Sequence, residues 1–165
     1  MGMFIPLTIE QLRPIQHGLV RRDFQKLLNV YDAGKFSEVL PGVAQHIHGD
    51  VYAVINGTHR TLMWGALGVD SPSFYVPEHA QDFIKASQFS AVPLEFIEET
   101  NNMISDLFDY CYMDLSYTQQ QGIRSFADLQ ESYGLHTLDD IRRFASGAIC
   151  HRWALDSREI YPMLE

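Results

Sequence analysis

The sequence predicts an α+β fold, with a small mixed sheet and helices over residues 1–77 followed by an all-helical extension over residues 78–165. Before Pro77, short apolar runs bounded by glycine and proline alternate with amphipathic helical stretches. After Pro77, helical spacing of apolar residues dominates. A strand, a glycine turn and a helix follow one another directly over residues 51–67. Because no linker separates the two parts, we expect the extension to pack on the first domain.

The early part of the chain is expected to hold an edge strand, a helical turn and one long helix. Residues 3–7 are apolar and include Pro6, which is typical of a short edge strand. Thr8, with Gln11 three residues later, predicts a brief helical turn before Pro14. A helix over residues 21–33 should end at Gly34, and its apolar side chains share one face: Phe24, Leu27, Leu28 and Tyr31.

The middle of the chain is expected to form a hairpin, a helix and a last strand. Within residues 39–48 a strand is expected after the Pro41-Gly42 turn, and residues 48–50 join it to a partner strand over residues 51–55. Asn56-Gly57 ends that strand, and helical spacing over residues 58–67 stops at Gly68. Residues 73–76 form the last strand, and the helices expected beyond Pro77 cover residues 79–89, 93–114, 125–133 and 137–153.

The amino-acid composition and charge argue against several classes of protein. Apolar residues make up 46% of the chain and aromatic residues 12%, which is typical of a packed globular protein. The net charge of −9, from 21 acidic and 12 basic residues, argues against nonspecific nucleic-acid binding. No long apolar run and no signal-peptide pattern occurs, so we expect a cytoplasmic protein without a membrane segment. Cys111 and Cys150 lack metal-ligand spacing and are expected to be buried thiols.

The turn Asn56-Gly57-Thr58-His59-Arg60 joins a strand to a helix and carries residue types that bind phosphate. The free N–H groups of a first helical turn and the helix dipole both favour a negative charge. Gly57 turns the chain without a Cβ, Thr58 can cap the helix or offer its hydroxyl to a phosphate, and Arg60 offers a planar fork of donors. His59 can donate or transfer a proton. The alternative is a plain turn in which Thr58 caps and both His59 and Arg60 are solvated.

The order of motifs over residues 5–76 adds to this interpretation. An Ile-Pro-Leu strand, a helix over residues 21–33 ending in Ala-Gly-Lys-Phe, and the run Gly-Asp-Val-Tyr-Ala-Val-Ile-Asn-Gly-Thr-His-Arg follow in that order. Together they resemble the ParB/sulfiredoxin-like superfamily, whose members bind CTP or ATP, or phosphorylate free serine with ADP or ATP. The resemblance implies that the turn holds nucleotide phosphates through Gly57, Thr58, His59 and Arg60. Asn56, which precedes them, is a further candidate contact.

Two departures from that superfamily narrow the chemistry. Sulfiredoxins carry their reactive cysteine where Thr58 stands, so reduction of a cysteine sulfinic acid is not expected. The serine-phosphorylating branch uses an early glutamate as base, whereas this chain offers Asp23 and no glutamate between Gln11 and Glu38. We therefore expect His59 or Asp23 to assist proton transfer. Arg22 is a candidate phosphate contact, with a solvated helix face as its alternative.

Three functions follow from the resemblance. The first is an ATP- or ADP-dependent phosphotransferase that acts on a small-molecule acceptor, with Mg²⁺ held mostly by the nucleotide phosphates. The second is a non-catalytic module in which a nucleotide such as CTP shifts a conformational equilibrium. The third, a DNA-processing factor, is disfavoured by the net charge and by the acidic residues of a faint helix-turn-helix pattern over residues 126–143.

Two further features bear on ligands and partners. His46 and His48 lie two residues apart and would share one face of a strand, but no third ligand stands nearby, so we expect a polar sheet face and no metal site. The apolar stripe of the helix over residues 93–114 indicates a possible homodimer surface.

Overall fold

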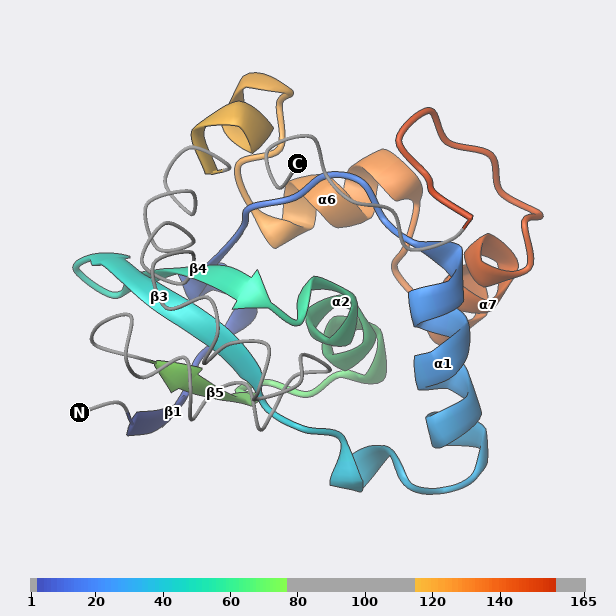
Figure 1. Ribbon diagram of the computed structural model, residues 1–165, viewed down its shortest axis with the longest axis horizontal. Coiled ribbons are helices and arrows are strands. Elements are labelled where there is room, and N and C mark those ends of the chain that lie inside the picture. The colour runs from blue at the N-terminus through green and yellow to red at the C-terminus, as the bar shows by residue number, and fades with distance from the viewer. Residues whose placement is uncertain (1–2, 77–114, 157–165) are drawn as a thin grey trace, which may run out of the picture.

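The computed structural model describes residues 3–76 and 115–156 (Figure 1). It confirms the α+β fold class, with a five-stranded mixed sheet accompanied by helices. The strands are β1 (Met3–Pro6), β2 (Leu12–Pro14), β3 (Gly42–His48), β4 (Val51–Asn56) and β5 (Ser73–Val76). The helices are α1 (Arg21–Asp32), α2 (Thr58–Leu67), α6 (Phe126–Tyr133) and α7 (Leu138–Ala145), and residues 115–120 are also helical.

The sheet has the strand order β1-β5-β3-β4-β2. The predicted hairpin is confirmed: β3 and β4 are antiparallel, and Gly49 in their connection has a φ of 52°. The edge strand β1 pairs antiparallel with β5, which runs parallel to β3. This order places β4, the strand that leads into the glycine turn, between β3 and β2.

The strand β2 was not predicted. The helical turn expected from Thr8 and Gln11 is present as the 3-10 turn Ile9–Gln11, and the N–H of Thr8 donates to Oε1 of Gln11 over 3.0 Å. The chain then extends and pairs parallel with β4, which brings the Leu12 side chain to 0% exposure. Burial of one leucine and pairing with a free sheet edge decide the conformation here, and neither is encoded in local spacing.

Helix α1 forms where its apolar face predicts it, and it buries Phe24 and Leu28. Helix α7 is shorter than the expected 137–153: it ends at Ala145, after which Gly147 takes a φ of 86°. That left-handed conformation stops the helix, and the chain continues as an irregular segment. Cys150 lies in this segment and is exposed, so the prediction that it is a buried thiol was wrong.

One hydrophobic core joins the sheet to the helices on both sides of the gap in the described chain. Helix α2 packs against α1 and α7, α1 packs against α7, and α6 contacts β2 (Figure 1). Phe24 of α1 meets Phe144 of α7 edge to face, with ring centroids 5.6 Å apart. The helices predicted over residues 79–89 and 93–114, with Cys111 and the expected dimer surface, lie outside the described residues, and the boundary near residue 77 stays a prediction.

No helix in the described ranges is long and apolar enough to cross a membrane.

Candidate functional site

The turn between β4 and α2 depends on a glycine. Gly57 is the N-cap of α2. Its φ of 113° and ψ of 24° are a left-handed backbone conformation that residues with a side chain rarely adopt. A Cβ at this position would lie 3.2 Å from the Cα of Gly42 and 3.2 Å from Nη2 of Arg60. The prediction that Gly57 turns the chain without a Cβ is therefore confirmed, and close packing adds a second reason for glycine.

Helix α2 begins without a side-chain cap. Of the two roles considered for Thr58, capping does not occur, because Thr58 is the first helical residue and Gly57 takes the cap position. The first intrahelical bond runs from the N–H of Thr61 to the carbonyl of Gly57 over 2.8 Å, so the preceding N–H groups of the first turn have no intrahelical acceptor. Thr58 is 2% exposed, and its Oγ1 has no hydrogen-bond partner in the described part of the chain. The start of α2 therefore combines the buried hydroxyl of Thr58 with the N–H groups of the first helical turn and the positive end of the helix dipole.

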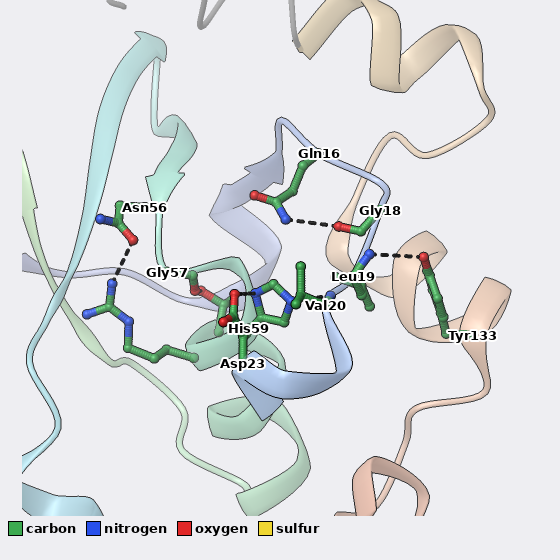
Figure 2. A network of polar contacts seen from close by, with 11 residues as sticks. Gln16, Gly18, Leu19, Val20, Asp23, Asn56, Gly57, His59 and Tyr133 are labelled. Carbon is green, nitrogen blue, oxygen red and sulfur yellow. Dashed lines mark hydrogen bonds and ion pairs between the residues drawn. The ribbon is translucent and has the colours of Figure 1, made fainter. Parts of the chain in front are cut away.

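His59 connects the turn to the start of α1 (Figure 2). Its Nε2 accepts the N–H of Val20 over 2.8 Å, so this nitrogen carries no proton. The proton then lies on Nδ1, which faces Oδ2 of Asp23 at 3.9 Å. The ring also meets Phe24 edge to face, with centroids 4.8 Å apart. The structure thus brings the two predicted catalytic side chains together, with His59 held by a backbone contact.

Arg60 points to the other side of the turn from His59. Its Nη1 donates to the carbonyls of Leu40 (2.8 Å) and Pro41 (2.9 Å), and its Nη2 donates to Oδ1 of Asn56 (3.0 Å). Figure 2 shows Asn56 and His59 on opposite sides of Gly57. Burial lowers the pKa of Arg60 to about 10, since desolvation penalises the charged form. Arg60 is therefore not solvated, as the plain-turn alternative had it, and it fastens the turn to the segment before β3.

The remaining predicted residues are less well placed for a direct role. Asn56 uses its side-chain oxygen on Arg60 and acts through that residue. Arg22 is exposed on the first turn of α1 and makes no polar contact with any described residue. His46 bonds through Nε2 with the carbonyl of Gly49 over 2.8 Å, and the register shifts between His46 and His48.

Sequence reasoning missed the backbone groups that hold this site. The Val20 N–H and the Leu40 and Pro41 carbonyls position His59 and Arg60, but every residue has a backbone N–H or carbonyl and side-chain identity does not reveal their use. The segment before α1 offers no local signal for the contact with His59, because the two residues lie 39 positions apart in the chain.

The faint helix-turn-helix pattern forms α6 and α7, with Gly134 between them at a φ of 69°. Arg142 pairs with Asp32 of α1, with an Nη1 to Oδ2 distance of 3.0 Å, and this contact lowers the pKa of Asp32. One of the two arginines of this segment is thus occupied within the protein, and α7 packs on α1.

A second histidine cluster predicts a pH dependence of stability. His17 and His151 pack around Trp153, with ring centroids 4.7 Å and 5.2 Å away. The pKa of each is lowered from 6.5, first by burial and then by the charge of Arg152. Because the folded state binds these protons less readily than the unfolded chain, their stabilising contribution is present above about pH 6.5 and is lost as the pH falls. We expect the free energy of unfolding, from urea titrations, to fall between about pH 7 and 5, and to fall less steeply in His151→Phe. An equal slope in that variant would refute this origin.

Comparison with known proteins gives a match among solved structures and none among family models or curated proteins. Among solved structures, the chain is similar to a Pnob8-like ParB-N domain in its C2221 form, with 15% sequence identity and a TM-score of 0.35 over 93% of this chain and 71% of that chain. Since a TM-score of 0.35 is a loose superposition, the site is defined by the contacts within this chain.

Proposed function

We propose that the turn at Gly57 binds the phosphates of a nucleotide, ATP, ADP or CTP. The observation that carries this proposal is the start of α2, where a left-handed glycine replaces a side-chain cap and Thr58 keeps a buried hydroxyl without a partner among the described residues. Backbone donors at a helix start are a general solution for binding phosphate. A buried hydroxyl without a partner is unfavourable by about 1–3 kcal/mol, which an acceptor oxygen from a ligand would offset.

The activity we propose is phosphoryl transfer to a small-molecule hydroxyl. In this step the acceptor oxygen forms a bond to the terminal phosphorus, the bond from that phosphorus to its bridging oxygen breaks, and the shortened nucleotide leaves with the electron pair. The hydroxyl proton passes to Asp23, because Nε2 of His59 is already used by Val20 while Asp23 has a side chain 23% exposed. His59, with its proton on Nδ1, orients that carboxylate.

The charge of Asp23 makes Mg²⁺ part of this proposal. A carboxylate beside a phosphate site repels a bare nucleotide, and a divalent cation relieves that repulsion. The phosphates and water would supply the Mg²⁺ ligands, which leaves the Asp23 carboxylate uncoordinated and able to accept the proton. No cluster of three potential ligand side chains occurs within residues 3–76 and 115–156.

A nucleotide-controlled switch is the second candidate. The His59–Val20 contact favours it, since one side chain of the proposed phosphate site holds the backbone at the start of another helix. The two candidates differ in turnover: a switch changes conformation with bound nucleotide and consumes none of it.

A thermal-shift series tests nucleotide binding. We expect ATP, ADP or CTP with Mg²⁺, at about one hundred times its dissociation constant, to raise the Tm by about 5–10 °C, because a ligand that binds only the folded state stabilises it. Adenosine and cytidine, which lack phosphates, serve as matched controls and should give no comparable shift. Equal shifts with and without phosphates, or none with any nucleotide, would refute the proposal.

A further inference from the structure

Residues 19–21, where the chain enters α1, contact three other parts of the protein and form a junction between them. The N–H of Leu19 donates to the hydroxyl of Tyr133 on α6 over 3.2 Å. The N–H of Val20 donates to His59 on α2 over 2.8 Å. The N–H of Arg21 donates to the carbonyl of Leu155 over 2.8 Å. Three consecutive backbone donors therefore have acceptors on three separate elements, and Figure 2 shows the first two contacts.

The C-terminal segment is fixed at this junction. Leu155 returns a bond from its N–H to the carbonyl of Leu19 over 2.8 Å, so that Val20 and Leu155 form a parallel bridge. The Arg21 side chain donates to the carbonyls of Phe144 and Ile149 and pairs with Asp156, which is 94% exposed. Backbone contacts with residues 19–21 and the side chain of Arg21 therefore help to hold the described end of the chain.

His59 belongs to the candidate phosphate site and also accepts a hydrogen bond from Val20 in the junction, so it links the two. Val20 is 3% exposed, so solvent does not readily replace the His59 acceptor if it is withdrawn. An anion at the start of α2 attracts positive charge and N–H donors. If the ring turns a nitrogen donor toward the anion, or takes up a proton at Nε2, the lone pair that accepts the Val20 N–H is lost.

We propose that occupation of the Gly57 turn by a phosphate ligand loosens the pairing of residues 19–21 with the segment around Leu155, and that His59 couples the two. The identity of the ligand rests on the proposed function, whereas the coupling follows from the contacts within the chain. Ligand binding at α2 then controls how firmly the C-terminal segment is held, which is a regulatory output for the site.

Amide hydrogen exchange on the full chain tests the coupling without any ligand. In His59→Phe the ring still packs on Phe24 but accepts no hydrogen bond, so the amides of Arg21 and Leu155 should exchange about tenfold faster than in the wild type. His59→Gln is the matched control, because its Oε1 can accept from Val20 and should restore slow exchange. The amides of the β3–β4 hairpin should be unchanged in both variants. Unchanged exchange at Leu155 in His59→Phe, or an equal rise at Leu155 and in the hairpin, would overturn the coupling.

A second series, with ATP, ADP or CTP and Mg²⁺ on the wild type, separates this inference from the proposed function. Binding with faster exchange at Leu155 supports both. Binding with unchanged exchange at Leu155 overturns ligand control and leaves nucleotide binding intact. If ATP, ADP and CTP all fail to bind, the proposed function and its ligand control fall together, while the comparison of the two His59 variants still decides the coupling.

Discussion

Replacing Arg60 by alanine is expected to destabilise the protein by about 2–4 kcal/mol, because it removes three donated hydrogen bonds and leaves their acceptors unsatisfied in a half-buried site. The acceptors are two backbone carbonyls before β3 and the Asn56 side chain, so the variant also releases the turn from that segment. The free energy of unfolding from urea titration measures this loss.

Two further variants test whether Arg60 stabilises the turn through its three hydrogen bonds or only through its charge. Arg22→Ala is the control, because Arg22 is exposed and has no polar partner among the described residues, and it should change stability by less than about 0.5 kcal/mol. Arg60→Lys keeps the charge but not the planar fork of donors. If the hydrogen bonds of Arg60 hold the turn, this variant should be more stable than Arg60→Ala but less stable than the wild type. An Arg60→Ala variant as stable as the wild type would show that the three contacts do not hold the turn in solution.

Replacing Gly57 by alanine is expected to destabilise the protein by about 2–4 kcal/mol and to displace the start of α2. Two causes add: a φ of 113° strains any residue with a side chain, and the new Cβ would lie 3.2 Å from the backbone of Gly42. Because the Gly42 contact involves backbone, the clash cannot be relieved by a side-chain rotation alone. Thermal and urea unfolding measure the effect.

Gly68→Ala is the matched control for that experiment. Gly68 ends α2 with a φ of 76°, but a Cβ at this position would have nothing within 4 Å, so the variant shows the conformational cost without the close contact. We expect that cost to be about 1 kcal/mol. Equal losses in the two variants would mean that close packing at Gly57 contributes nothing.

Local sequence signals predicted the parts of the fold whose causes are local. The apolar face of α1, the glycine that ends it, the β3–β4 hairpin and the strand-turn-helix at Gly57 all depend on residues within a few positions of one another. Strand β2 depends instead on pairing with β4, some 40 positions later, and on burial of Leu12, so residues 12–14 carried no strand pattern of their own.

In the candidate site, too, the features with local causes were predicted and those that depend on distant segments were not. Residue types placed Gly57, Thr58, His59 and Arg60 at one turn. The sequence also indicated His59 and Asp23 as separate candidates for proton transfer, but it did not predict that they lie next to each other. The directions of the side chains were not predictable, because His59 turns to a backbone N–H and Arg60 to backbone carbonyls from distant segments. Capping by Thr58, one of its two predicted roles, does not occur, since a left-handed glycine takes the N-cap position and the helix starts one residue earlier.

Calorimetric titrations of ATP, ADP and CTP, each with Mg²⁺, into wild-type protein and into Thr58→Val test the central claim, that the start of α2 binds nucleotide phosphates. Valine keeps the shape of threonine and removes the buried hydroxyl that has no partner among the described residues, so the free protein should be at least as stable as the wild type. We expect the wild type to bind and the variant to bind about tenfold more weakly, because a phosphate oxygen loses one hydroxyl donor. Absence of binding of all three nucleotides by the wild type, or equal affinity in both proteins, would contradict this account of the site.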